Sequence, residues 1–335
     1  MLRQRVLVLV LVALVALVGC GPDTTWQPAF DATEAGWLMN VWGPSEDERF
    51  AVGGGLDDGT VVRFDGETWA EDPSVPDTPL LNWVYGFGPD DVHVVGNEGT
   101  ILHWDGSAWA ARESPTDQDL WGVWGAAPDD VYAVGGTARG PDGVPTIVHF
   151  DGDAWRAVDV TVETENVAAF FKVWGTGPDD VWVVGDRGVV MHWDGAAWTE
   201  EKVARDDLVS LWGTGPNDIV AVGGRGNGIV AHWDGTEWRS EFAEPLPGLN
   251  GVWMREPGVA HIVGLRGTVA VFDAETFEIT ELTASRTVDG AEVREPLDFH
   301  AIHGVGGQVV AVGGNLAFPA DPRGIAYLRE LGDQE

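Results

Sequence analysis

The sequence predicts a seven-bladed β-propeller, an all-β fold in which seven four-stranded sheets surround a central axis. One phrase, running from Trp124 to Gly135, recurs with a mean spacing of about 43 residues. Its copies begin at Tyr85, Trp174 and Trp212, and weaker copies begin at Trp42, Trp253 and His303. A second phrase, His-Trp-Asp-Gly-x-x-Trp, follows the first and ends at Trp109, Trp155, Trp198 and Trp238. Repeats of about 40–50 residues are typical of propeller blades.

Each repeat contains four strand-like runs, as the fourth unit illustrates. Its runs cover residues 170–174, 181–184, 189–193 and 197–200. The first turn reads Gly-Pro-Asp-Asp and the third reads Asp-Gly, which are residues that favour tight turns. Because the runs are apolar almost without interruption, both faces of each sheet must be covered. Sheets covered on both sides by their neighbours form a propeller.

The seventh unit predicts how the ring closes. It has three strands, at 301–303, 309–312 and 325–328, and no Asp-Gly-x-x-Trp strand follows them. An isolated copy of that strand lies before the first unit, at residues 23–27. We therefore expect the N-terminal strand to complete the seventh blade, which removes the open sheet edge. The propeller would occupy residues 25–335, with units starting near residues 36, 80, 120, 169, 208, 249 and 297.

The N-terminus predicts export. Arg3 and Arg5 precede an apolar run, Val6 to Val18, that is too short to span a bilayer but typical of a signal peptide. The run ends in Leu-Val-Gly-Cys20, which resembles a bacterial lipobox. The resemblance implies that residues 1–19 are a lipoprotein signal peptide and that Cys20 carries the lipid of a short tether, residues 20–24. It also implies secretion across the inner membrane and anchoring in the outer membrane. The alternative is an ordinary signal peptide with a chance cysteine.

The two phrases together resemble bacterial secreted propeller repeats of the form W-G-x-G-P-D-D-V-W-A-V-G followed by H-W-D-G-x-x-W. They are similar to Asp-box (BNR-like) repeats, although here aspartate and glycine are adjacent and the serine of the Asp-box is missing. The resemblance covers residues 23 to about 330 and implies a propeller architecture. It does not identify a ligand, because propellers serve as enzymes, receptors and scaffolds.

Composition excludes several classes of function. The 54 acidic residues outnumber 19 basic ones and give a net charge of −35, which excludes nucleic-acid binding because that requires a basic surface. Cys20 is the only cysteine, so the chain has neither an internal disulfide nor a cysteine-based metal site.

Histidines and paired carboxylates repeat with the blades, so each set has a structural interpretation. Four histidines share one repeat position, and we expect each to make the same local hydrogen bond: His103, His149, His192 and His232. The repeated pairs, such as Asp90-Asp91, Asp129-Asp130 and Asp179-Asp180, are interpreted as turn formers. We expect no cofactor and no metal; calcium is the one ion left open, although no Asp-x-Asp-x-Asp-Gly loop occurs.

The aromatic residues are interpreted mainly as packing residues, and no catalytic motif accompanies them. Tryptophans at the repeat positions, Trp69 to Trp238, should lie in the core, whereas Trp37, Trp83 and Trp121 fall outside those positions and could line the channel and stack on sugars. No nucleophile elbow or phosphate loop is present. We therefore expect no enzyme activity.

Five consecutive units carry Arg-Gly between the second and third strands. The arginines are Arg139, Arg187, Arg225, Arg266 and Arg323. In an antiparallel blade these second turns share a face with the connections between blades, where loop length varies most, and variable loops on a regular scaffold are the usual site of recognition. The alternative is that these arginines are ordinary solvent-exposed turn residues.

We therefore predict a monomeric, lipid-anchored binding or scaffold module whose partner is an envelope protein or a glycan. The arginine-bearing face would point away from the membrane and bind that partner. Two alternatives stay open: a glycan-active hydrolase or lyase on a propeller scaffold, and a structural subunit of an envelope complex.

Overall fold

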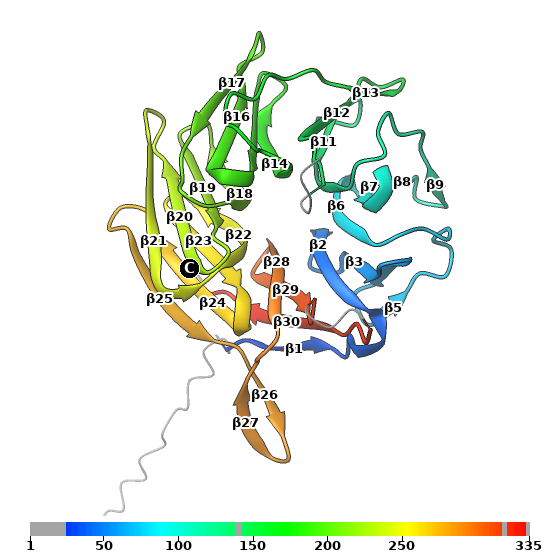
Figure 1. The fold of residues 1–335 in the computed structure, drawn as a ribbon. Helices are drawn as coiled ribbons and strands as arrows, with labels where there is room; N and C mark the ends of the chain where they lie inside the picture. The colour runs from blue at the N-terminus through cyan, green and yellow to red at the C-terminus, as the bar shows by residue number, and fades with distance from the viewer. Residues whose placement is uncertain (1–24, 138–142, 317–319, 333–335) are drawn as a thin grey trace, which may run out of the picture.

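The computed structural model describes residues 25–137, 143–316 and 320–332, and its strands form seven four-stranded antiparallel sheets around a ring (Figure 1). The predicted seven-bladed propeller is confirmed. Within the described residues, no helix has the length and apolar character needed to cross a membrane.

Blades one to three begin at the innermost strand and proceed outwards. Blade one contains β2 (Trp37–Ser45), β3 (Glu48–Gly55), β4 (Asp58–Phe64) and β5 (Trp69–Glu71). Blade two contains β6 (Leu81–Gly88), β7 (Asp91–Gly96), β8 (Ile101–Trp104) and β9 (Trp109–Ala111). Blade three contains β10 (Leu120–Ala127), β11 (Asp130–Gly135), β12 (Thr146–Phe150) and β13 (Trp155–Ala157).

Blades four to six follow the same order. Blade four contains β14 (Phe170–Gly177), β15 (Asp180–Gly185), β16 (Val189–Trp193) and β17 (Trp198–Lys202). Blade five contains β18 (Leu208–Gly215), β19 (Asp218–Gly223), β20 (Asn227–Trp233) and β21 (Trp238–Pro247). Blade six contains β22 (Leu249–Glu256), β23 (Val259–Gly264), β24 (Thr268–Asp273) and β25 (Glu278–Thr283). Short 3-10 turns are η1 (Thr33–Ala35), η2 (Asn97–Gly99), η3 (Asp186–Gly188) and η4 (Leu265–Gly267).

Blade seven joins the two ends of the chain, as predicted. It contains β28 (Asp298–Val305), β29 (Gln308–Gly314), β30 (Gly324–Glu330) and, as its outer strand, β1 (Gln27–Phe30). Gln27 lies opposite Leu328, so Trp26 precedes the strand in the position that Trp69 has in blade one. Trp26 is buried beside Ala284 at the end of blade six. The closing strand therefore begins at the last residue of the predicted range, 23–27, and extends to Phe30; residues 23 and 24 lie outside the described part.

The innermost strands contact one another through tryptophan and glycine. The ring of Trp124 lies against Gly175 of the next blade, and the ring of Trp174 lies against Gly213 of the blade after that. A Cβ atom on Gly175 would lie 2.8 Å from the indole of Trp124, and one on Gly213 would lie 2.6 Å from that of Trp174. The repeated dipeptide Trp-Gly thus supplies a ring for the following blade and a space for the ring of the preceding one.

The first and third turns of each blade also contact each other. The glycine of each Asp-Gly turn has a positive φ, between 85° and 94°, as its residue type predicts. The preceding aspartate accepts backbone N–H groups, as Asp105 does from Ser107 (2.9 Å) and Ala108 (2.9 Å). A Cβ atom on Gly106 would lie 2.7 Å from the Cβ of Asp90, so the glycine is also needed where the Pro-Asp-Asp turn packs against it.

One connection departs from the prediction of an irregular loop. Residues 285–296 form the hairpin β26 (Ser285–Val288) and β27 (Ala291–Arg294), which projects from the rim beside blade seven (Figure 1). Glu295 at its base is buried and accepts a hydrogen bond from the hydroxyl of Tyr327 (2.7 Å). Alternating polar and apolar residues in the hairpin could have indicated paired strands, but the two strands pair only with each other.

We predict that Gly175→Ala destabilises the fold by about 1–3 kcal/mol, because the added methyl group would overlap both the indole of Trp124 and the carbonyl oxygen of Asp180. Gly177→Ala is the matched control, since a Cβ atom there meets nothing within 4 Å. Urea unfolding followed by tryptophan fluorescence measures both. Equal unfolding free energies for the two variants would contradict the role given to the Trp-Gly contact.

Candidate partner-binding face

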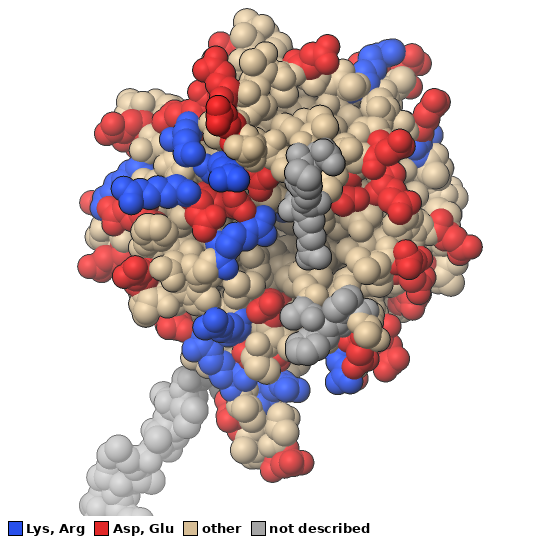
Figure 2. All heavy atoms as spheres, in the orientation of Figure 1, with Lys and Arg blue, Asp and Glu red and all other residues tan. Residues whose placement is uncertain are grey.

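The two faces of the ring have different turns. First and third turns, Pro-Asp-Asp and Asp-Gly, form what we call the regular face. Second turns and the connections between blades form the opposite, irregular face, which Figure 2 shows. The loops of the irregular face vary in length from the single residue between β21 and β22 to the hairpin-bearing connection before β28.

Four of the five predicted arginines lie exposed on the irregular face. They are Arg187, Arg225, Arg266 and Arg323. Arg139 lies outside the described residues. Lys and Arg side chains gather mainly over blades five and six in Figure 2, whereas Asp and Glu dominate much of the remaining rim.

A shared backbone conformation and hydrogen bond explain why the second turns resemble one another. Arg187 and Arg266 adopt the left-handed conformation, with φ of 62° and 57°. The N–H of Arg187 donates to Asp207 (2.8 Å), and that of Arg266 donates to Asp298 (2.8 Å). Glu98 makes the same bond to an aspartate in blade two, so the turn does not require arginine.

The arginine side chains differ in whether an aspartate forms an ion pair with them. Arg225 pairs with Asp207 at 2.5 Å and lies over the ring of Phe171, and Arg323 pairs with Asp321 at 2.7 Å. The side chain of Arg187 makes only a long bond, 3.4 Å, to the carbonyl of Asn166. Arg205, which sequence reasoning missed because it lies outside the repeat positions, is exposed on the connection that holds Asp207.

The mouth of the channel on this face contains a partly buried lysine. Lys172 on β14 reaches past Gly122 of blade three and lies 3.7 Å from the ring centre of Trp83 in blade two. Its Nζ donates to the carbonyls of Trp121 (2.6 Å) and Phe171 (3.1 Å). Burial lowers the pKa of Lys172 to about 7.

The three tryptophans outside the repeat positions are engaged in packing. Trp37 is buried and its Nε1 donates to Asn315 (3.1 Å). Trp121 is half-buried and donates to the carbonyl of Gly136 (2.9 Å), while Lys172 covers Trp83. Of the tryptophans at the repeat positions, Trp109 and Trp155 are buried, and Trp69, Trp198 and Trp238 are half-buried at the outer strands.

Exposed large apolar side chains concentrate on the irregular face. Within the described residues, those on its second turns and connections are Leu56, Val144, Leu316, Val288 and Val293. Phe242, on the outer strand β21, is the other large apolar residue that is exposed, at 48 %. None of them lies on a described first or third turn, so of the two faces only the irregular one has both exposed apolar side chains and these arginines among its described residues.

The repeated histidines lie towards the regular face and make one kind of bond, as predicted. Each donates from Nε2–H to the aspartate that begins the second strand: His103 to Asp91 (2.7 Å), His149 to Asp130 (2.6 Å), His192 to Asp180 (2.8 Å) and His232 to Asp218 (2.9 Å). In blade one Arg63 and Glu48 make the equivalent pair at 3.2 Å. The second aspartate of each pair thus joins two strands as well as ending the turn.

Comparison with known proteins supports the fold. No family model matches the chain, and no curated protein matches it in sequence. A solved structure described as YCF48 bound to D1 peptide is 18% identical, covers 92% of this chain and 97% of its own, and has a TM-score of 0.64. The WD40 propeller domain of Doa1 and the WD40 repeats of RRP9 are each 10% identical, cover 91% and 92% of this chain and 97% and 98% of their own, and have TM-scores of 0.67.

We predict that Lys172 makes stability depend on pH. Its folded-state pKa, about 7, lies below the ordinary lysine value of 10.5, so the unfolded chain binds more protons between these values and the unfolding free energy rises with pH. Compared with Lys172→Met, the wild-type protein should gain on the order of 2 kcal/mol between pH 7 and 10. Urea unfolding at several pH values measures the difference. Parallel curves for the two proteins would mean that the carbonyls and Trp83 fully stabilise the charged amine.

Proposed function

We propose that this protein is an extracytoplasmic, lipid-anchored propeller that binds a segment of a protein partner on its irregular face. The observation that carries the proposal is the composition of that face. Exposed aliphatic side chains and exposed arginines lie on its loops, whereas the regular face is built from short, repeated acidic turns. Arginine is enriched at protein interfaces, and the buried centre of an interface is more apolar than the rest of the protein surface.

The properties of the face favour a protein over a glycan. Sugar sites usually need an exposed aromatic platform, but Trp37 is buried, Trp83 lies under Lys172, and Trp121 is only partly exposed. The large apolar residues that are exposed on the second turns and connections, such as Leu56 and Val144, are aliphatic. One of the structural neighbours is described as bound to a peptide, which is consistent with this use of the fold.

The charge of the face favours an acidic partner segment. Arg187, Arg205 and Arg266 are exposed and have no ion pair within the described residues. The rest of this strongly acidic chain, with a net charge of −35, would repel such a segment. The arginines would therefore decide where an acidic segment docks.

The proposed anchor is consistent with this orientation. Outer strands begin next to the third turn, so β1 begins on the side of the regular face. Cys20 lies outside the described residues, six positions before Trp26. A chain of that length spans at most about 20 Å. A lipid on Cys20 would thus hold the regular face near the membrane and leave the irregular face accessible.

We expect Cys20→Ser to abolish lipid attachment, because the thiol is the acceptor of the diacyl group that the lipobox resemblance implies. In cells fed a labelled fatty acid, the wild-type protein should be labelled and found with membranes. The variant should be unlabelled and released by washing. Equal labelling of the two proteins would contradict anchoring at this residue.

We expect substitution of Arg187, Arg205 and Arg266 by glutamate to weaken partner binding at least tenfold, since three charges reverse on one face. Arg225 is left intact because its side chain holds Asp207. The control replaces Arg156 and Arg239, exposed arginines of the outer strands β13 and β21, by glutamate.

Photo-crosslinking in cells identifies the partner used for this measurement. A crosslinker at Arg187 should capture a discrete protein, whereas one at Ser107, on a third turn, should not. Capture from Ser107 together with unchanged binding of the Arg187/Arg205/Arg266 variant would place the site on the regular face.

A further inference from the structure

Blade two carries a histidine at one position of its second strand that is apolar or aromatic in most other blades. The position is aromatic in blades one, three and four, as Phe50, Tyr132 and Trp182, and is a valine in blades five and seven, as Val220 and Val310. Blade six also has a histidine there, His261, but it faces Val271, and Val259 stands where blade two has Asp91. Tyr132 and Trp182 stack on the repeated histidine of their own blade, with ring centres 4.2 Å and 3.7 Å apart. In blade two the position is His93, directly opposite His103 on the neighbouring strand.

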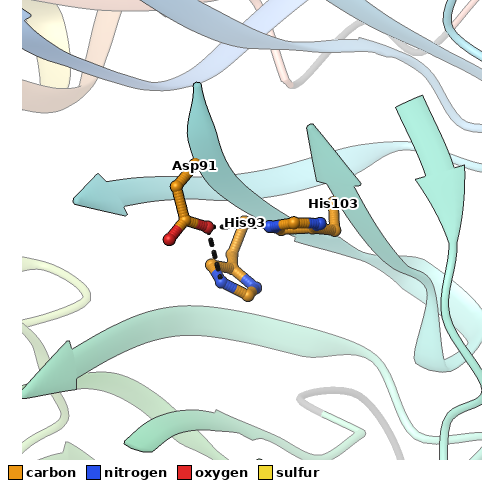
Figure 3. Close-up of side chains that lie close together, drawn as sticks. All are labelled: Asp91, His93 and His103. Carbon is orange, nitrogen blue, oxygen red and sulfur yellow. Dashed lines mark hydrogen bonds and ion pairs between the residues drawn. The ribbon is translucent and has the colours of Figure 1, made fainter. Parts of the chain in front are cut away.

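The substitution brings three potential metal ligands together. Asp91 and His93 are two residues apart on β7 and so lie on the same face of the sheet, and His103 faces them from β8 (Figure 3). Asp91 Oδ1 lies 2.7 Å from Nε2 of His103 and 3.5 Å from Nε2 of His93. One ligand atom of each residue lies within 4.8 Å of the others. No other such group occurs within the described residues.

His93 lacks the partners that a buried imidazole needs. Its side chain is 5% exposed; Nδ1 has no hydrogen-bond partner, and Nε2 has only the 3.5 Å ion-pair contact with Asp91. The rings of Phe87, Phe150 and Trp155 surround it, with centres 6.1–6.4 Å away. Burying a ring nitrogen that has no hydrogen bond is unfavourable, and most other blades avoid this with an apolar or stacked side chain. A metal ion is one partner that would satisfy a nitrogen aimed at Asp91 and His103.

The cluster is accessible from solvent. Asp91, His93 and His103 line a pocket of about 460 Å³ on the regular side of blades two and three. The remaining lining includes Asp90, Asp105 and Arg112. An ion could therefore enter and keep an open coordination position towards the pocket. Asp105 is already engaged with its own turn, so it does not extend the ligand set.

We infer that Asp91, His93 and His103 form a binding site for one divalent transition-metal ion, with zinc the best match. Two imidazoles and one carboxylate suit zinc and related ions better than calcium, which prefers oxygen ligands. Three protein ligands leave a fourth position for water or a bound group. This inference departs from the sequence-based expectation of a metal-free chain, and it is independent of the partner proposed for the irregular face.

Arg112 limits the affinity of the site for a metal ion. It donates to Nδ1 of His103 at 2.9 Å, so the Nε2 proton of His103 points at Asp91. Coordination through Nε2 requires the proton to move to Nδ1 and Arg112 to swing away. Arg112 is exposed and free to do so. Its replacement by glutamine should remove a positive charge and supply an acceptor for the new Nδ1–H, which strengthens metal binding.

The test is calorimetric titration of the folded propeller with zinc chloride in excess magnesium, which suppresses weak binding to surface carboxylates. The wild-type protein should bind one zinc ion, and Arg112→Gln should bind it several-fold more tightly. His93→Tyr, which places the blade-three residue in blade two, should weaken binding at least tenfold. If His93→Tyr folds poorly, His103→Ala removes a different ligand, at a position that is only half-buried.

A variant designed to create a second zinc site provides a further test. Tyr132→His in blade three would face Asp130 and His149 as His93 faces Asp91 and His103, and it should create a second zinc site. Asp130→Asn in the wild-type background is the matched control and should leave zinc binding unchanged. If His93→Tyr and His103→Ala bind zinc as the wild-type protein does, or if Asp130→Asn weakens binding equally, the inference is wrong and His93 serves only as an aromatic filler.

Discussion

The packing of a central tryptophan against the glycine of the next blade is the contact that recurs most often between the innermost strands. Seven innermost strands must approach one axis, and a side chain at the glycine position would overlap the neighbouring indole, as the 2.6 Å approach at Gly213 shows. Four of the seven junctions make this contact, at Gly86, Gly175, Gly213 and Gly304, and Phe87 takes the place of the indole against Gly125. Blade six has Met254 in place of the glycine. The repeated contact therefore sets how closely adjacent blades approach at most junctions of the ring.

The two faces follow from how the blades are built. On the regular face, turn glycines pack against the Pro-Asp-Asp turns and aspartates pair with histidines, so length and sequence there are constrained by contacts within each blade. On the irregular face, an aspartate holds only the backbone of the second turn, as Asp207 holds Arg187. The side chain of the second-turn residue and the neighbouring loops can then vary without destabilising the blade. A recognition surface is free to evolve on that face while the ring stays the same.

Breaks in the repeat identify specialised positions better than the repeat itself does. The repeated histidines are structural, since each pairs with the aspartate of its own blade. His93 breaks the pattern and creates the three-residue cluster, and Lys172 breaks it at the channel mouth, where it contacts Trp83 two blades away. In both cases the polar group occupies a position where most other blades have an apolar or small residue. Such a substitution is costly unless a partner satisfies the group.

The sequence by itself determined the number of blades, the turn types and the closure by an N-terminal strand, because these depend on local turn chemistry and on a repeat that can be read along the chain. It also determined the role of the repeated histidines, since one residue type in every blade points to one local contact. Only the tertiary structure decided that His93 faces His103 and that Lys172 reaches Trp83. These contacts depend on cross-strand register and on the curvature of the ring, and neither leaves a spacing signal in a single chain. The offset start of β1 and the hairpin β26–β27 were missed for the same reason, because strand pairing at the rim depends on what the neighbouring blade leaves uncovered.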